Sequence, residues 1–153
     1  QIPYLPIYTK ANWFADGREA TLPNDFYSSE FLVSKTIEFI NDRQDHRPFF
    51  AYLPFQAVHI PVQAPKHFTD KYLDTYAGGW NALRETRQRA AIELDHVPSS
   101  SKMLDMSSTA DWDSLDADEK RYQAKRMAVY AGMVEETVVF CGEQGFDKLW
   151  GNP

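Results

Sequence analysis

Three features are scarce in this sequence, and each scarcity excludes a class of structure or function. The single cysteine, Cys141, excludes a disulfide within the chain and leaves the redox compartment open. No run of about 18 apolar residues occurs, so we expect no membrane-spanning helix. Positive charge is also scarce, because 16 lysines and arginines stand against 22 acidic residues, for a net charge of −6. This balance disfavours nucleic acid or an anionic membrane as a partner.

What the sequence does contain is typical of a globular protein. Apolar residues make up 43% of the 153 residues and aromatic residues 14%, enough for a self-supporting core. We expect a single domain over residues 1–153. The sequence begins at Gln1 without a methionine or a signal peptide, which predicts either a removed export signal or a part of a longer chain.

The most distinctive stretch runs from Arg47 to Lys66 and reads RPFFAYLPFQAVHIPVQAPK. Its first half, residues 48–55, is uncharged, aromatic and bounded by prolines, which predicts a central strand over residues 49–55, buried on both faces of a parallel sheet. The proline-rich second half predicts a stiff loop that leaves the end of this strand and carries His59. A lone histidine in a loop is also typical of a packed or surface residue, so the residue pattern by itself leaves its role open.

Helical periodicity precedes and follows the predicted strand. Helices are predicted over four ranges: 31–40, 65–71, 80–94 and 117–134. Ser28 or Ser29 is expected to cap the first helix, and Asp116 with Glu119 has the spacing of a capping box at the last one. A helix, a polar turn and a buried strand make half of a βαβ unit. We therefore predict an α/β fold, with a partial parallel or mixed sheet flanked by helices.

The last helix and the two ends of the chain give further expectations. The core-facing stripe of the last helix is predicted to contain five residues: Tyr122, Met127, Tyr130, Met133 and Val134. β-branched residues predict a strand over residues 137–141. Ile2, Leu5 and Ile7 are expected to form a short strand within an extended N-terminal arm. Residues 97–111 are rich in serine and threonine, which predicts a loop.

Four ordered segments match known motifs at compatible spacing. Residues 49–65, FFAYLPFQAVHIPVQAP, resemble an aromatic strand followed by Q-A-P-H-x-P-x-Q-A-P, with Val58 in place of the proline before the histidine. Residues 76–84, YAGGWNALR, resemble Y-D-x-G-W-D-x-L-R, and residues 112–135 resemble W-D-S-L…E-K…R-M…Y-A-x-M-V-E. Residues 26–40 are similar to a helix that precedes the strand. These are features of the sulfatase family, in particular of bacterial arylsulfatases in the alkaline phosphatase superfamily.

This resemblance covers about residues 25–135 and implies a piece of the alkaline-phosphatase-like sulfatase fold. It also implies hydrolysis of sulfate esters by a formylglycine nucleophile made from cysteine, with a divalent cation, commonly calcium, held by carboxylates. His59 is the one family active-site residue that carries over cleanly, and it would donate a hydrogen bond to the sulfate or to the leaving oxygen. We expect it to be at least partly exposed, in a pocket that segments outside this chain complete.

Other parts of the family site have no counterpart in the sequence. The nucleophile motif C-x-P/S-x-R does not occur, since Cys141 is followed by GEQG. We therefore expect no cofactor in this chain itself, and calcium only in the complete family enzyme. Glu143 and Gln144 stand where the family has a metal-binding S-D-N-G, and they are either longer replacements for those ligands or a chance similarity.

Two function classes remain open on this basis. The chain is either the central part of an arylsulfatase, inactive alone, or a non-catalytic binding or assembly module derived from a sulfatase. An independent hydrolase built on His59 would lack a nucleophile. A sheet cut to this length would expose edges and aromatic side chains, which predicts a homo-oligomer, most simply a two-fold dimer. The alternative is a monomer in which a strand over residues 137–141 fills the vacant edge.

Overall fold

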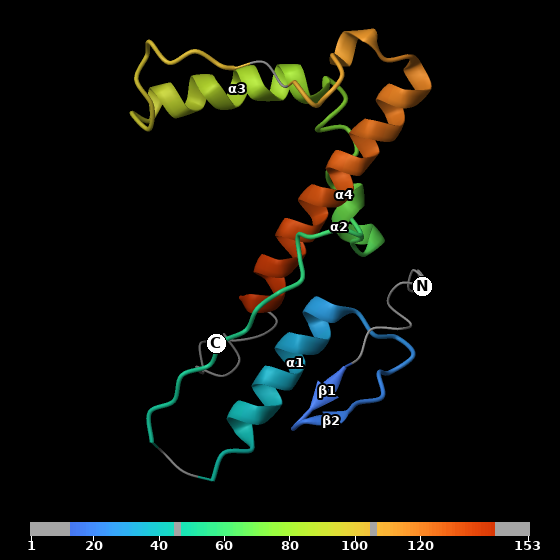
Figure 1. The fold of residues 1–153 in the computed structure, drawn as a ribbon, viewed down its shortest axis with the longest axis vertical. Helices are drawn as coiled ribbons and strands as arrows, with labels where there is room; N and C mark the ends of the chain where they lie inside the picture. Colours follow the sequence, from blue (N-terminus) through green and yellow to red (C-terminus); the bar gives the residue numbers. More distant parts are fainter. Residues whose placement is uncertain (1–12, 45–46, 105–106, 143–153) are drawn as a thin grey trace.

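The computed structural model describes residues 13–44, 47–104 and 107–142, and α4 forms the long axis of this part of the chain (Figure 1). α1 lies beside the C-terminal half of α4, α2 packs against its middle, and α3 extends sideways near its N-terminal end. In chain order the elements are β1 (Phe14–Ala15), β2 (Arg18–Glu19), α1 (Ser28–Asn41), α2 (Lys66–Asp70), α3 (Gly79–Glu93), the short 3-10 helix η1 (Trp112–Ser114) and α4 (Ala117–Cys141).

Three of the predicted helices, over residues 31–40, 65–71 and 80–94, are confirmed as α1, α2 and α3. The predicted cap of α1 is wrong, because Tyr27 holds the N-cap position without a side-chain hydrogen bond and Ser29 is buried instead. The cap of α4 is confirmed. The Oδ1 atom of Asp116 accepts a hydrogen bond from the backbone N–H of Glu119 at 2.8 Å.

α4 continues through residues 137–141, where we predicted a strand, so that prediction is wrong. Val138 and Val139 favour strands intrinsically, but tertiary packing outweighs a preference of this size. The helical conformation brings Phe140 onto Phe68 of α2, with ring centroids 6.2 Å apart. The hydroxyl of Thr137 donates back to the Met133 carbonyl at 2.8 Å, a contact that belongs to a helix.

The predicted central strand over residues 49–55 is also wrong, because this segment lies outside regular secondary structure. Within the described residues the one sheet is the small antiparallel hairpin of β1 and β2. A strand buried on both faces needs covering layers on each side, and here the helices cover one side only. Leu53 and Phe55 pack against the core, whereas Phe50 is 90% exposed and Tyr52 is 79% exposed. The segment therefore keeps the alternation of a strand without the sheet.

The core joins α1, α2 and α4 through Val33, Phe68 and Phe140. α2 approaches α4 closely at Gly132, where an added Cβ would lie 3.1 Å from the backbone nitrogen of Thr69. Small residues on this side of α4 admit that approach. The buried residues of α4 are Ala124, Ala128, Gly132, Met133, Glu136 and Phe140. The stripe predicted from sequence is therefore confirmed at Met133 and wrong at Tyr122, Tyr130 and Val134, which are exposed, while Met127 is half-buried.

A second cluster attaches α3 to η1. The ring of Trp112 is buried and meets the edge of Trp80 at a centroid distance of 4.8 Å. The indole N–H of Trp80 donates to the Ala110 carbonyl at 3.1 Å. Gly79 begins α3 directly under the Trp112 ring, with a φ of +74° that favours glycine. This cluster fixes the direction in which α3 leaves α4.

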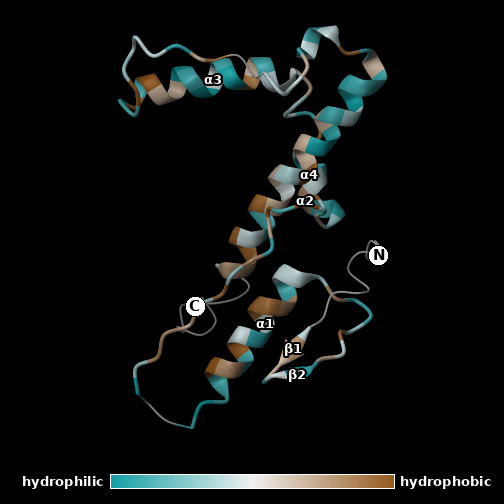
Figure 2. Ribbon diagram, viewed as in Figure 1, coloured by the Kyte–Doolittle hydropathy of each residue, from teal (hydrophilic) through white to brown (hydrophobic). Residues whose placement is uncertain are grey.

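The loop predicted over residues 97–111 is confirmed for its described parts, residues 97–104 and 107–111, which contain no helix or strand. It returns along α3, where the side-chain amide of Gln88 donates to the Ser101 carbonyl at 2.9 Å. Hydrophobic residues gather on α1 and the C-terminal half of α4, whereas α3 is largely hydrophilic (Figure 2). No helix within the described ranges is both long and apolar enough to cross a membrane. The expected N-terminal strand at Ile2, Leu5 and Ile7 lies outside the described residues.

Candidate functional site

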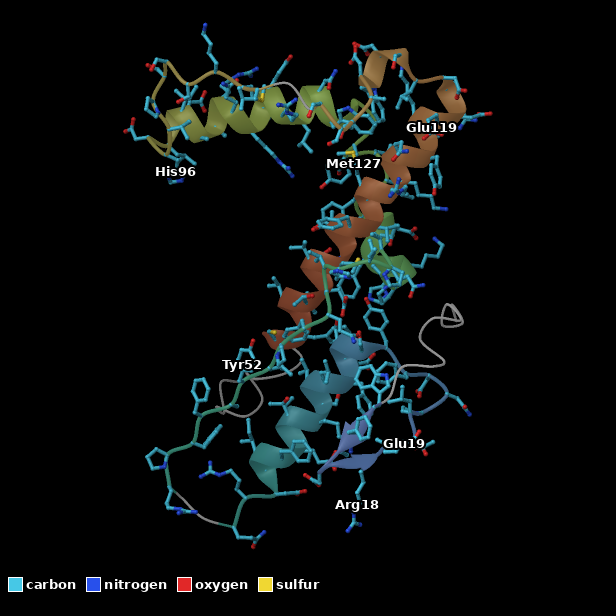
Figure 3. The ribbon with its side chains drawn as sticks, viewed as in Figure 1. Arg18, Glu19, Tyr52, His96, Glu119 and Met127 are labelled. Carbon is cyan, nitrogen blue, oxygen red and sulfur yellow. The ribbon has the colours of Figure 1, made fainter. Side chains whose placement is uncertain are left out.

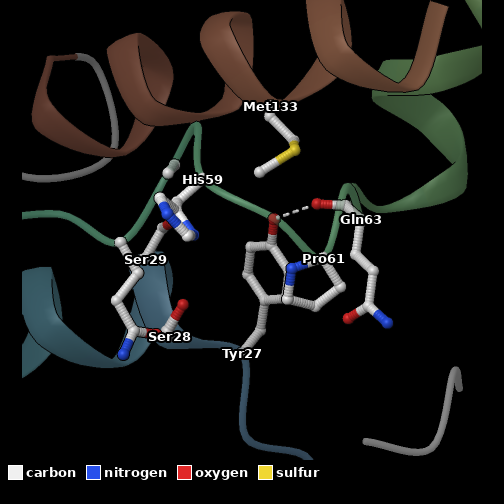
Figure 4. Close-up of a pocket in the computed structure, with 9 residues that line it drawn as sticks. Tyr27, Ser28, Ser29, His59, Pro61, Gln63 and Met133 are labelled. Atoms are coloured by element: carbon white, nitrogen blue, oxygen red, sulfur yellow. Dashed lines mark hydrogen bonds between the residues drawn. The ribbon is translucent and has the colours of Figure 1, made fainter. Parts of the chain in front are cut away.

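His59 lies in the loop that joins the apolar segment to α2, and its side chain is exposed, as predicted. It lines a small pocket of about 60 Å³ (Figure 4). The pocket brings together the N-terminal end of α1, this loop and α4. Its lining consists of Tyr27, Ser28, Ser29, Gln56, Ala57, His59, Pro61, Gln63 and Met133. Three segments distant in the sequence therefore meet around the histidine.

Two short contacts set the position of His59. Its backbone N–H donates to the Gln56 carbonyl at 2.9 Å, which closes a tight turn. Its ring nitrogen Nδ1 lies 2.8 Å from the Ile60 carbonyl oxygen. A carbonyl is an acceptor only, so Nδ1 carries the hydrogen in this contact. The other ring nitrogen, Nε2, is then left to accept a proton or, in the charged form, to donate one.

Tyr27 connects this loop to α4. Its hydroxyl oxygen lies 3.0 Å from the Gln63 carbonyl oxygen and 2.7 Å from Oε2 of Glu136 (Figure 4 shows the first contact). The two partners stand 36 and 109 residues from Tyr27 in the sequence. One phenol thus holds the end of the His59 loop and the C-terminal half of α4 at the same point.

Glu136 is fully buried, with no exposed surface. Burial raises the pKa of its carboxyl group from 4.5 to about 7, and the negative charge of Glu30 adds to the rise. Hydrogen bonding from Tyr27 and Ser29 opposes it only in part. Burial and the nearby Glu136 carboxylate in turn raise the pKa of Tyr27 well above its usual 10. The other oxygen, Oε1, is buried without a hydrogen-bond partner among the described residues.

Sequence reasoning missed Tyr27, Ser29 and Glu136. A signal was present, because Glu136 stands between Met133 and Phe140 at helical spacing, on the side that both bury. It was lost when the predicted helix ended at residue 134. An acidic side chain within a buried stripe is rare unless it is paired, and it marks a position with a special role.

Among the described residues, Cys141 is not activated as a nucleophile, and no cluster of metal-ligating side chains occurs. Burial raises the pKa of the Cys141 thiol, with a further rise from the charge of Glu136, so the thiolate is disfavoured. Nowhere in the described ranges do three His, Cys, Asp or Glu side chains come together in a way that could hold a metal ion. The calcium of the resembled enzymes therefore finds no ligand set in this part of the chain. Glu143 and Gln144 lie outside the described residues.

Comparison with known proteins decides the family. The family model described as Sulfatase matches residues 5–137, which is most of the chain. The chain belongs to the sulfatase family. The matched range extends the resemblance seen in the motifs to both sides. Sulfatases have an alkaline-phosphatase-like α/β fold, to which the described helices and small hairpin contribute only a part.

Two curated sulfatases are similar to the chain. An uncharacterized sulfatase of Schizosaccharomyces pombe is 37% identical over 137 residues, which is 88% of this chain and 24% of that protein. An arylsulfatase of Klebsiella aerogenes is 30% identical over 119 residues, which is 78% of this chain and 26% of that protein. The chain thus spans about a quarter of the length of these sulfatases.

Proposed function

We propose that these residues supply the His59 loop of an arylsulfatase-like sulfuric ester hydrolase, within one sulfatase domain. The isolated 153-residue chain is then a partial sulfatase that lacks the formylglycine nucleophile and most metal ligands. The observation that carries the proposal is the placement of His59. It is exposed, fixed by its own backbone and ring contacts, and set in a pocket formed by α1, α4 and its loop. This arrangement supports the role that the motif implies.

Sulfate ester hydrolysis places negative charge on the sulfate and on the leaving oxygen as the S–O bond breaks. A histidine whose Nδ1 is committed to a carbonyl presents a single free nitrogen, Nε2. In its charged form this nitrogen donates a hydrogen bond to either oxygen and gives the proton to the leaving alcohol. His59 therefore acts as the general acid, or as a charge stabiliser, in a site whose nucleophile comes from elsewhere in the domain.

In this proposal calcium belongs to the complete enzyme. Bound among carboxylates, it would supply a fixed positive charge for the sulfate oxygens. The described residues do not bring such carboxylates together, so the role of this part of the chain is limited to positioning His59.

The proposal predicts that the purified chain does not hydrolyse an aryl sulfate. General acid catalysis has nothing to assist when the nucleophile is missing, and only residual catalysis remains. The measurement is release of 4-nitrophenol from 4-nitrophenyl sulfate at micromolar chain concentration, with and without calcium. Turnover above background that His59→Ala removes would overturn the view of the chain as a partial site.

A second candidate, a non-catalytic assembly module, is favoured by exposed apolar surface. Phe50 and Tyr52 are largely exposed, as is Val138, at 65%, on the open side of α4. That side of α4 also borders a groove of about 540 Å³ between α4 and α3. Leaving large apolar side chains in water costs roughly 1.5–3 kcal/mol for each one that could be fully buried.

We therefore propose that the isolated chain forms a homo-oligomer, most simply a dimer that covers these side chains. Static light scattering at micromolar concentration is expected to give twice the monomer mass. The double variant Phe50→Ser with Tyr52→Ser is expected to shift the mass towards the monomer. A wild-type mass that stays at the monomer value on concentration would contradict this proposal and leave the sulfatase assignment untouched.

A further inference from the structure

If Glu136 is ionised, the Tyr27 hydroxyl has one hydrogen for two acceptors, the Glu136 carboxylate and the Gln63 carbonyl. A phenol has a single hydrogen to donate, and the Gln63 carbonyl and a carboxylate are both acceptors. The Tyr27 oxygen lies within hydrogen-bonding distance of both, at 3.0 Å and 2.7 Å. The one Tyr27 hydrogen cannot serve both acceptors, and although the Ser29 hydroxyl also hydrogen-bonds Glu136, an ionised Glu136 would bury a negative charge.

A proton on Glu136 removes both problems. Its O–H then donates to the Tyr27 oxygen, and the Tyr27 hydroxyl is free to donate to the Gln63 carbonyl. The three groups form a chain of hydrogen bonds in which every donor has an acceptor. Such a chain runs in one direction, from α4 through the N-terminal end of α1 to the loop.

We propose that Glu136 is a positioning residue that carries a proton and, through Tyr27, fixes the loop that presents His59. The inference rests on the proposed function of that loop and adds to it a specific means of control. Gln63 is four residues beyond His59, and both line the same pocket with Tyr27 (Figure 4). Loss of the Tyr27 donation would release the loop at Gln63, four residues beyond the histidine.

The charged and titratable groups around Glu136 favour the protonated form. Burial and, to a smaller extent, the negative charge of Glu30 on α1 raise the pKa of Glu136 to about 7, although the hydrogen bonds from Tyr27 and Ser29 oppose the rise. On α4 itself, the Cys141 thiol is neutral at this pH because its pKa is raised. Glu135, next to Glu136, is paired with Lys71, which follows α2, at 2.5 Å. α2 contributes the uncharged Phe68 to the core, and the loop contributes His59 to the lining of the pocket.

The raised pKa of Glu136 sets how its contribution to stability depends on pH. Because Glu136 holds its proton more tightly in the folded chain than in the unfolded chain, its contribution to stability is greatest below pH 4.5. That contribution falls as the pH rises from 4.5 to about 7, and it levels off above this value. Above it the carboxylate competes with Gln63 for the Tyr27 hydrogen, and the loop becomes less well held.

Three matched variants distinguish control of the loop by the Glu136 proton from a role of Glu136 in packing alone. Glu136→Gln keeps the shape and supplies an N–H that donates to Tyr27 at every pH. Tyr27→Phe removes the hydroxyl and breaks the chain at every pH. Glu135→Gln removes a carboxylate from the adjacent position of the same helix and leaves the Tyr27 contacts in place. Histidines also change charge between pH 5 and 8, so each result is taken as a difference from wild type.

The experiment measures hydrogen exchange at the His59 amide of the full chain at pH 5 and pH 8, corrected for intrinsic rates. Wild type and Glu135→Gln are expected to lose protection about threefold to tenfold at pH 8, the effect of one net hydrogen bond. Glu136→Gln is expected to stay protected at both values, and Tyr27→Phe to be poorly protected at both. A carbon-detected titration of the wild-type Glu136 carboxyl is expected to give a midpoint near 7.

Three results would overturn the inference. They are a Glu136 midpoint near 4.5, a Glu136→Gln chain with the pH dependence of wild type, or a Glu136→Gln chain as poorly protected as Tyr27→Phe. The titration uses the unmutated chain, so it decides the question even where a variant does not fold. None of these readouts involves sulfate hydrolysis, so failure of the inference is distinct from failure of the proposed function.

Discussion

Gly79→Ala is expected to destabilise the chain by roughly 2–5 kcal/mol, the largest effect expected for an alanine at any of the described glycines. An added Cβ at Gly79 would lie 2.0 Å from Cδ2 and 2.2 Å from Cε2 of the buried Trp112 ring. The ring has no open space to move into, because it is buried against Trp80. The φ of +74° adds a backbone penalty of about 1–2 kcal/mol for a residue with a side chain.

Two other glycines separate the steric effect from the backbone effect. Gly17 has a φ of +76° with nothing within 4 Å of an added Cβ, so Gly17→Ala carries the backbone penalty alone. Gly78 has a φ of −77°, and its nearest neighbour to an added Cβ is Ala82 at an ordinary 3.6 Å. Gly78→Ala is therefore expected to be neutral or stabilising by up to about 1 kcal/mol.

Urea unfolding followed by far-UV circular dichroism gives the free energies for all three variants and the wild type. From most to least stable, the expected order is Gly78→Ala, wild type, Gly17→Ala and Gly79→Ala. If Gly79→Ala lost no more stability than Gly17→Ala, the Trp112 ring would not lie over the start of α3 as described.

The helices could be predicted from the sequence because their signals are local. Apolar spacing identified α1, α2 and α3, and the Asp116 cap identified the start of α4. The end of α4 could not be predicted in this way. Val138 and Val139 favour a strand locally, and the helix there depends on Phe140 meeting Phe68, a contact between residues far apart in the sequence.

The strand prediction over residues 49–55 failed for a different reason. Its composition is that of a strand inside a sheet, but composition does not provide the neighbouring strands. The described residues offer one packed side, so Leu53 and Phe55 are partly covered while Phe50 is exposed. The pattern predicted which side chains are favourable to bury. It could not predict whether other parts of this chain pack against them.

One residue of the candidate site, His59, was also predictable. His59 was found because its loop follows a family motif, and its exposure agrees with that role. Glu136 and Tyr27 were not found, since their importance depends on a contact across 109 residues. Only the folded chain brings a buried acid next to the phenol that also holds the histidine loop.

Replacing His59 is expected to have the largest effect on activity once the nucleophile is supplied. We consider the arylsulfatase of Klebsiella aerogenes with the 119-residue stretch it shares with this chain exchanged for the residues described here. In that enzyme His59→Ala is expected to lower kcat by about 10²–10⁴, the range for loss of a general acid. His96→Ala is the matched control, because His96 is also exposed but lies at the far end of α3 (Figure 3).

The pH profile distinguishes loss of an acid from loss of structure. General acid catalysis makes the rate depend on pH, so an enzyme that uses His59 as its general acid has a pH dependence that the His59→Ala enzyme lacks. Equal circular dichroism spectra of the two enzymes would show that the fold is kept.

The most direct test of the central claim is therefore the turnover of 4-nitrophenyl sulfate by this exchanged enzyme and its His59→Ala variant. The assignment of His59 to the sulfatase reaction predicts at least a hundredfold fall in kcat for His59→Ala, at the lower limit for general acid catalysis. It also predicts no change for His96→Ala. An active exchanged enzyme whose kcat is unchanged by His59→Ala would contradict the claim.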